Sequence, residues 1–364
     1  MMKKIFVTMK YFQRIFVVIA MFLWNCLASS QVINGVVYDE DTKLPVSNVH
    51  VYLDGTSINA VTNHSGVFAL NAKSIINTKL VLSHVSYETN IIDRPFNGLS
   101  DTLYIKEKIQ ELYEITVTAD RFTRKQKMKV FLEQFLGMSR AGRSCTITNE
   151  DDIQLFFNTQ TNKLSALSDK PIEVVNDYLG YKISFILEDF WVQYVKESLE
   201  DDFLLSSFFS VVSSFSDIAP NNRRIKLRRD DVYEKSTNYF FKHFANNTLE
   251  DNKFKLFNKS FPVNPQIFFT TQDTLSLKMI NIIPREDINK RGEYNIYMGR
   301  TLSGMFSVLF RKNVRSDIYF GTESFIVDRY GNIDQIDKLF FYGQMGNNRA
   351  GDMLPIDYDP FVTQ

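Results

Sequence analysis

Residues 31–105 alternate between apolar and polar positions in short runs, which is the period of half-buried β-strands. In one run, from 49 to 53, valine or leucine occupies every second position. Residues that favour turns separate the runs, at 39–45, 54–55 and 63–66. Strands at this spacing, with no helical pattern between them, predict an antiparallel β-sandwich.

From residue 121 onward the helical period appears as well. Met128, Phe131 and Phe135 recur at helical spacing, and Gly137 follows at a position that suits the end of a helix. The residues 228–246 show the clearest helical pattern in the chain, with aromatic side chains near one side.

Strand patterns nevertheless dominate this second part. The run 203–215 is apolar and rich in serine, so it fits either a strand or a buried helix. A predicted hairpin turn at 158–162 separates the first two of the alternating runs. These runs are 153–157, 163–167, 172–175, 181–187, 275–280, 294–297, 305–310 and 324–327. The whole chain is therefore predicted to be mainly β, with an α+β, sheet-rich second domain over 121–364.

Residues 1–30 have the pattern of a secretory signal peptide. Four cations and no acid precede an apolar stretch at 15–24, and Ala28, Ser29 and Ser30 follow as small residues. This order predicts export, with cleavage after Ser30.

Two alternatives exist for this segment. An uncleaved anchor is disfavoured because the apolar stretch is shorter than the ~20 residues that span a bilayer. A lipoprotein would be acylated at Cys26, but Asn25 stands where a small residue is expected. After cleavage Cys145 is the one remaining cysteine, so no internal disulfide can form, and its strand-like surroundings predict a buried thiol.

Composition narrows the class of protein. The chain has 364 residues, and its 42 lysines and arginines balance 42 aspartates and glutamates. This balance argues against a nucleic-acid binder that works by bulk positive charge. The four cations of residues 1–30 would leave with the signal peptide, so the net charge would fall from 0 to −4. The 32 phenylalanines and 17 tyrosines favour sheet.

A resemblance emerges from the order and spacing of many positions in the first module. They include Gly35, Asp39, Thr42, Pro45, Val49, Val51, Gly55, Thr56, Val61, Asn63, Gly66, Phe68 and Leu70. In this respect residues 31–120 resemble the carboxypeptidase-regulatory-like domain. The resemblance implies a transthyretin-like β-sandwich of seven strands, closed by a strand at 111–119. Similar domains precede TonB-dependent outer-membrane receptors and other exported proteins of Bacteroidetes.

The family name does not imply a peptidase here. A catalytic zinc site of that kind needs two histidines and a glutamate around an open position. The chain has four histidines, none followed by a glutamate at the spacing of a zinc-binding helix. No metal, no cofactor and no catalytic residue are therefore predicted.

Residues 121–364 resemble the unit that follows the regulatory-like domain in short exported proteins of Bacteroidetes. Among the matching positions are Gly137, Cys145, Asn149, Asn176, Gly180, Tyr181, Arg228, Arg229, Tyr233, Phe240, Gly331, Arg349, Asp352 and Pro355. This resemblance supplies no catalytic residues, because no activity is assigned to that unit.

These patterns predict a non-enzymatic, exported binding protein of the cell envelope, periplasmic or associated with the outer membrane. It would contact a protein or glycan partner, no nucleic acid, and the membrane at most peripherally. The predicted ligand-facing residues are the polar and aromatic ones of the two best-matched motifs of the second domain. They are Arg228, Arg229, Tyr233, Arg349 and Asp352. A structural network that ties the helix to the C-terminus explains the same residues.

The alternative is an envelope hydrolase that acts on glycan or peptide. Its general acid and base would be Glu188 with Asp189 or Asp202. An enzyme of this kind should show a cleft where two carboxylates converge with perturbed pKa values.

Overall fold

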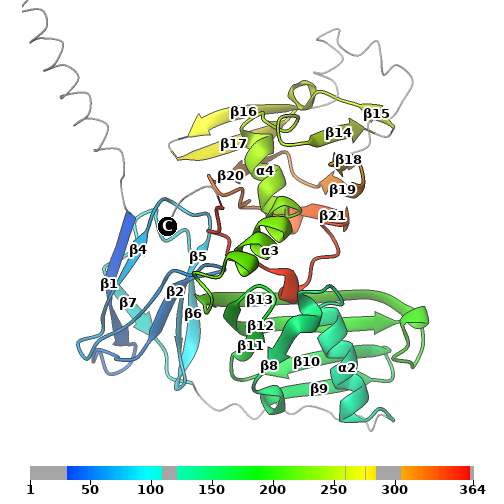
Figure 1. The fold of residues 1–364 in the computed structure, drawn as a ribbon. Helices are drawn as coiled ribbons and strands as arrows, with labels where there is room; N and C mark the ends of the chain where they lie inside the picture. The colour runs from blue at the N-terminus through cyan, green and yellow to red at the C-terminus, as the bar shows by residue number, and fades with distance from the viewer. Residues whose placement is uncertain (1–30, 109–120, 259, 275, 284–304, 361–364) are drawn as a thin grey trace, which may run out of the picture.

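The computed structural model describes residues 31–108, 121–258, 260–274, 276–283 and 305–360. Figure 1 shows three packed bodies, which we call the sandwich (31–108), the middle sheet (121–217) and the C-terminal layer (223–360). The predicted signal peptide with Cys26, the predicted strand at 294–297 and the expected closing strand at 111–119 lie outside the described residues.

The sandwich consists of two sheets, of three and four strands. The first has the order β4-β1-β7 and the second the order β3-β2-β5-β6. The strands are β1 (Gln31–Asp39), β2 (His50–Leu53), β3 (Asn59–Val61), β4 (Val67–Ala72), β5 (Lys79–His84), β6 (Tyr87–Asp93) and β7 (Thr102–Ile105). The side chains that the alternation predicted to be inside, such as Val49, Val51 and Leu53, form the core. The predicted mainly-β fold is confirmed, although β1 and β7 run parallel.

The middle sheet has six strands and one covering helix. Its order is β8-β11-β12-β10-β9, and β13 pairs with β12 on the other side. The elements are α2 (Arg124–Phe135), β8 (Cys145–Ile147), β9 (Ile153–Asn158), β10 (Lys163–Ser168), β11 (Ile172–Asn176), β12 (Tyr181–Tyr194) and β13 (Leu204–Asp217). Phe131 and Phe135 of α2 pack on Phe190 and Phe185 of β12. The ambiguous run 203–215 is thus a strand, because it can pair with β12 along its full length.

The C-terminal layer packs two sheets around a helix. The sheets have the orders β15-β14-β18-β19-β21 and β16-β17-β20. The elements are α3 (Arg223–Glu234), α4 (Thr237–Ala245), β14 (Phe254–Asn258), β15 (Phe261–Pro262), β16 (Phe269–Thr274), β17 (Leu277–Ile282), β18 (Met305–Phe310), β19 (Val314–Phe320), β20 (Ser324–Val327) and β21 (Leu339–Gly343). The ring of Phe241 in α4 lies against Phe320, Phe325 and Phe341, which belong to both sheets.

The prediction of one helix over 228–246 is wrong in its extent. Asn222 caps a helix that begins five residues earlier, and its side chain accepts from the N–H of Arg224 and of Ile225. The helix ends at Glu234, because the Ser236 side chain accepts from the N–H of Tyr239 and begins α4. The break turns the aromatic residues of α4 into the core of the C-terminal layer.

Short 3-10 helices complete the described chain, at Gly142–Ser144, Glu150–Asp152, Asp201–Phe203, Pro265–Ile267, Ile336–Lys338 and Ala350–Asp352. Within the described residues, no helix has the length and apolar composition needed to cross a bilayer.

Candidate functional site: a cleft where three bodies meet

The sandwich joins the middle sheet through a strand-like contact on the edge of β13. The N–H of Gly55 donates to the Ser213 carbonyl at 2.7 Å, and the N–H of Phe215 donates to the Thr56 carbonyl at 2.9 Å. The Asp54 carboxylate accepts from the N–H of Ser213 at 2.8 Å. Gly55 has a φ of +72°, and a Cβ there would lie 3.2 Å from the Ile356 side chain, so the turn requires glycine.

The C-terminal layer joins the sandwich through two more carboxylates. Asp328 accepts from the N–H of Asn77 at 2.9 Å. Asp357 accepts from the N–H and the hydroxyl of Ser57, each at 3.3 Å. The N–H of Ile356 also donates to the Gly55 carbonyl at 2.8 Å. Backbone and carboxylate hydrogen bonds therefore fix the three bodies relative to one another.

A cavity of ≈ 750 Å³ lies at this junction, and we call it the cleft. Its walls come from all three bodies, and most of the residues that line it are polar. The sandwich contributes Asp54, Gly55, Asn77, Thr78, Lys79, Asp93 and Arg94. The middle sheet contributes Val211 and Ser213, and the C-terminal layer contributes Thr237, Asn238, Gly331, Asn332, Ile333, Asp334, Ile336, Met353 and Ile356. A volume of this size accommodates a small molecule or a short stretch of polymer.

Asp54 is an electrostatically unusual group of the cleft. Burial raises the pKa of its carboxyl from 3.8 to about 6, although the hydrogen bond from the Ser213 N–H and the charge of Lys79 both lower it. The charge of Glu188 raises this pKa further. Burial also raises the pKa of Asp328 and of Asp357. The three carboxylates that join the bodies thus carry their negative charge at an energetic cost.

An unsatisfied donor lies in the same wall. The side-chain nitrogen of Asn77 is buried and has no hydrogen-bond partner among the described residues. A buried donor of this kind is costly unless a ligand or water accepts from it. The cleft therefore combines a buried, unpartnered amide in its wall with the carboxylates of Asp54, Asp93 and Asp334.

A second hollow of ≈ 320 Å³ continues the cleft toward apolar surface. The two hollows share Thr237, Asn238, Ile336, Met353 and Ile356. The second is lined mainly by apolar and aromatic groups. They include Val232, Tyr233, Phe341, Met345, Leu354 and Pro355. Together they form one groove that is polar beside the sandwich and apolar beside α3.

Of the predicted ligand-facing residues, Arg229 is engaged within the chain. It is 5% exposed, and two of its nitrogens donate to the Asp217 carboxylate at 2.7 and 2.8 Å. It also donates to the carbonyls of Leu179 and Gly180. Arg228 is less enclosed and lies over the Tyr178 ring. These contacts join α3 to the start and the end of the long hairpin of β12 and β13.

Tyr233 and Asp352 line the apolar hollow, whereas Arg349 lies beside β13. Tyr233 is 3% exposed, and its buried hydroxyl has no partner among the described residues. Asp352 accepts from the Ser139 hydroxyl at 2.5 Å and from the N–H of Arg349 at 3.3 Å. The Arg349 guanidinium donates to the Ser207 hydroxyl at 3.4 Å. The structure thus brings Tyr233 and Asp352 to one hollow, whose lining does not include Arg228 or Arg229.

The acids of the alternative hydrolase do not line the groove. Glu188 and Asp189 are exposed on β12, and Asp202 is exposed in a 3-10 helix. The Ser210 hydroxyl donates to Glu188 at 2.6 Å. Cys145 is half-buried, and burial raises the pKa of its thiol to about 12, so the reactive thiolate is disfavoured.

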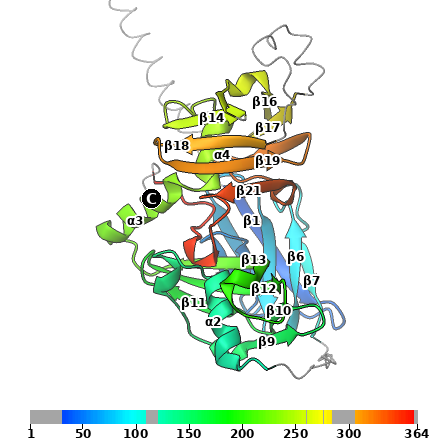
Figure 2. The same ribbon diagram turned by 90° about the vertical axis from the view of Figure 1, so that its right-hand side faces the viewer.

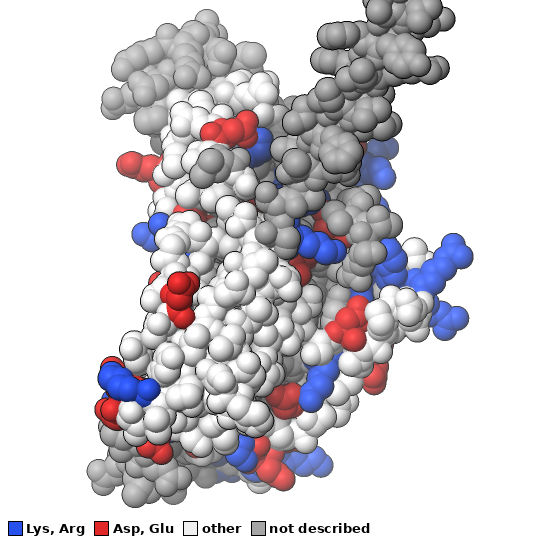
Figure 3. All heavy atoms as spheres, turned by 90° about the vertical axis from the view of Figure 1, so that its left-hand side faces the viewer, with Lys and Arg blue, Asp and Glu red and all other residues white. Residues whose placement is uncertain are grey.

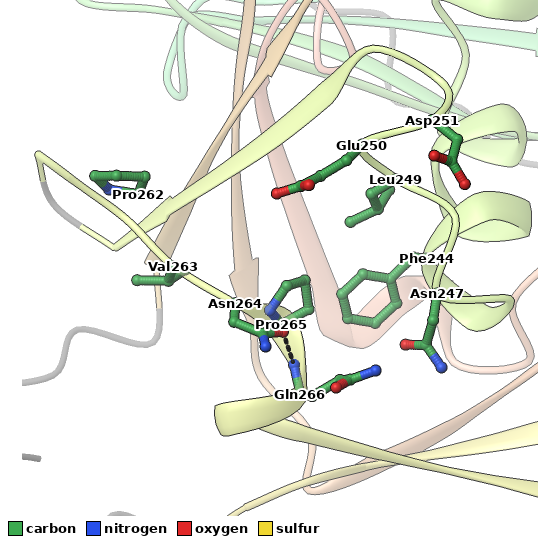
Figure 4. Close-up of a pocket in the computed structure, with 10 residues that line it drawn as sticks. All are labelled: Phe244, Asn247, Leu249, Glu250, Asp251, Pro262, Val263, Asn264, Pro265 and Gln266. Atoms are coloured by element: carbon green, nitrogen blue, oxygen red, sulfur yellow. Dashed lines mark hydrogen bonds between the residues drawn. The ribbon is translucent and has the colours of Figure 1, made fainter. Parts of the chain in front are cut away.

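No group of three His, Cys, Asp or Glu side chains within the described parts of the chain is placed to hold a metal ion. A separate pocket of ≈ 520 Å³ opens at the far end of α4, and Figure 4 shows its lining. Glu250, Asp251 and Gln266 stand around a floor made by Phe244 and Pro265. None of the residues predicted from sequence belongs to it.

The outer face of the sandwich is also distinctive. The exposed side chains of β1, β4 and β7 include no charged residue, and Figure 3 shows a broad uncharged area on this side of the molecule. They are Val32, Asn34, Val67, Ala69, Asn71, Thr102 and Tyr104. This face is flat, whereas the groove is concave, so the groove is the better candidate for a ligand.

Sequence reasoning did not find the cleft. Asp54 and Gly55 were interpreted only as a turn, and the run 203–215 gave no sign that the edge of its strand meets them. A sequence signal for Asp54 exists in the Asp-Gly pair, which places an acid before a residue of positive φ, but it does not reveal the partner.

Comparison with known proteins supports the predicted identity of the first module. Residues 33–117 match the CarboxypepD_reg-like domain. None of the curated proteins compared with the chain matches it. The matched residues include Asp54, Gly55, Asn77, Lys79 and Arg94, which form the sandwich wall of the cleft.

Proposed function

We propose that this chain is an exported, non-enzymatic binding protein that holds a protein or glycan ligand in the cleft. The observation that carries the proposal is that one concave surface takes walls from three bodies, which direct hydrogen bonds hold in place. A preformed site of this kind avoids the cost of ordering separate bodies when the ligand binds.

The location rests on two observations. Residues 1–30 carry the pattern of a secretory signal peptide, and the first module matches the CarboxypepD_reg-like domain, whose resemblance to modules of exported proteins supports export. We therefore place the protein in the periplasm or at the outer membrane of a bacterium similar to Bacteroidetes. The ligand would be a component of the envelope.

The test is capture of envelope components by the purified protein, followed by their identification. A Thr237→Trp variant would fill the place where the two hollows join, since Thr237 lines both. The matched control is Thr161→Trp in the exposed turn between β9 and β10. We expect wild type and Thr161→Trp to capture the same component, and Thr237→Trp to lose at least tenfold. Equal capture by all three, with equal melting temperatures, would contradict a role for the groove.

A hydrolase stays the second candidate because of Asp54. A carboxyl whose pKa is about 6 is partly protonated near neutral pH, as a general acid must be. Release of labelled fragments from envelope glycan or peptide by wild type, and its loss in Asp54→Asn, would establish this candidate in place of the first.

A further inference from the structure

Strand β13 lies at an edge of the middle sheet, and part of this edge is open. β13 pairs with β12 along one side. On the other side the Ser213 carbonyl and the Phe215 N–H point outward and bond to the sandwich. Because successive residues of a strand point their backbone groups to opposite sides, Ser207, Phe209 and Val211 also point theirs outward.

These outward groups have no backbone partner in the part of the chain that the structure describes. The side chains at this end of the strand are accessible, with Leu205 62% and Phe208 46% exposed. An unpaired row of N–H and C=O groups is a template for another strand. The open edge therefore extends over about five residues, from Ser207 to Val211.

Before Asp217, β13 itself carries none of the residues that usually protect such an edge. Folded proteins shield edge strands with charged side chains, proline or a covering element. β13 has no charge and no proline from Leu204 to Ser216, where it consists of serine and apolar residues alone. A strand edge without such residues can accept an added strand from a partner.

The elements around the open edge favour the addition of a single strand to β13 rather than of a whole sheet. Figures 1 and 2 both place the C-terminal layer over the edge of β13. Val211 and Ser213 line the cleft, so the open edge leads into it. The chain already adds its own residues to the neighbouring part of this edge, where Thr56 forms a parallel bridge with Ser214. The open part continues that interface.

We propose that the ligand is an extended polypeptide segment, uncharged over about five residues, which adds as a strand to the edge of β13 at Ser207–Val211. This inference rests on the proposed function and narrows its ligand from protein or glycan to polypeptide. Backbone hydrogen bonds supply the binding, and the cleft receives the end of the segment beyond Val211. The Arg349 guanidinium beside Ser207 favours a carboxylate on the ligand near that end of the edge.

The test uses a phage-displayed library of random nonapeptides, selected on the full-length protein. Enriched peptides are synthesised with a fluorescent label, and their dissociation constants are measured by anisotropy. Ser207→Pro removes the outward N–H without breaking the pairing with β12. Ser207→Ala is the matched control, since it loses the same hydroxyl contacts and keeps the N–H.

We expect Ser207→Ala to bind within about twofold of wild type and Ser207→Pro to bind at least tenfold more weakly. Peptides N-methylated at alternate positions should lose binding to the wild-type protein as well, which tests the backbone bonds without altering the protein. Failure to enrich any peptide, or equal binding by both variants and by methylated peptides, would overturn the inference. Capture of a glycan that depends on Thr237, without peptide binding, would overturn it and leave the proposed function intact.

Discussion

The two halves of β13 contrast within a single strand. Around Ser213 and Phe215, the outward backbone groups bond to the sandwich, and Asp217 at the strand end is held by Arg229. From Ser207 to Val211 the same kind of groups meet no backbone partner among the described residues. The sequence is uncharged through both halves, so composition does not decide which half is covered.

The difference lies in what the neighbouring bodies bring to the edge. The covered half meets a turn in which Gly55 can take a positive φ and Asp54 can accept a hydrogen bond. The open half meets side chains instead, chiefly Arg349 at Ser207. One turn of the sandwich therefore closes the edge of β13 around Ser213 and Phe215, and the edge from Ser207 to Val211 stays available to a partner.

The largest expected effect comes from the anchor at the covered end. Arg229→Ala leaves the carboxylate of Asp217 without its guanidinium and removes the donors from Arg229 to the carbonyls of Leu179 and Gly180, of which Gly180 keeps the N–H of Ile218. Loss of one partner of a buried pair costs about 3–5 kcal/mol. Urea unfolding should show this decrease in the free energy of unfolding. A decrease below about 1 kcal/mol would mean that α3 does not hold the hairpin.

A smaller effect is expected where the sandwich contacts β13. Ser213→Pro removes the N–H that donates to Asp54, and a bond to a charged group contributes about 1.5–3 kcal/mol. Ser213→Ala keeps that N–H and is the control. We expect thermal unfolding to separate the two variants by this amount. If they melt together, the bond to Asp54 does not stabilise the docking.

The pH dependence follows from the raised pKa of Asp54. The pKa of this carboxyl is about 6 in the folded chain, whereas the ordinary pKa of an aspartate, expected in the unfolded chain, is 3.8, so the folded state binds the proton more tightly. Stability should therefore rise as pH falls from 7 to 4, by about 2 kcal/mol from this group. The measurement is urea unfolding of wild type and Asp54→Asn across that range. A difference between them that does not change with pH would contradict the prediction.

The smallest expected effect is at the open half. Ser207→Pro should lower the free energy of unfolding by about 1 kcal/mol or less, because the N–H that it removes faces outward and bonds to no backbone group among the described residues. Ser207→Ala serves again as the reference. A loss as large as that of Ser213→Pro would show that the two halves are equally engaged, and the contrast would fail.

The sandwich could be predicted because its strands pair over short distances and alternate regularly. The same holds for the hairpin of β9 and β10, whose turn lies at 158–162. The strands β14, β16, β19 and β21 were not predicted. β14, for example, pairs with β18, which lies far along the chain, so its short run carries little local signal. β21 likewise pairs with β19 across the intervening β20, whereas β16 and β19 form hairpins with their neighbours β17 and β18, so distant pairing does not explain why these two strands were missed.

The candidate site depended even more on distant contacts. Arg228 and Arg229 were named as ligand-facing, yet Arg229 pairs with Asp217, before the helix. Tyr233 and Asp352 were named as ligand-facing and do line the apolar hollow. Asp54 was not named, because the burial that raises its pKa is created only when the three bodies meet.

Gly55 gives the molecule an additional mechanical property. Its N–H is bonded to the middle sheet and its carbonyl to the chain beside β20 and β21, through Ile356. Displacing either neighbour strains the same peptide units, so a slow opening of one interface should loosen the other at the same time. Amide exchange at Gly55 and at Ile356 would then proceed at matching rates, as for parts of one cooperative unit rather than of domains tethered in series.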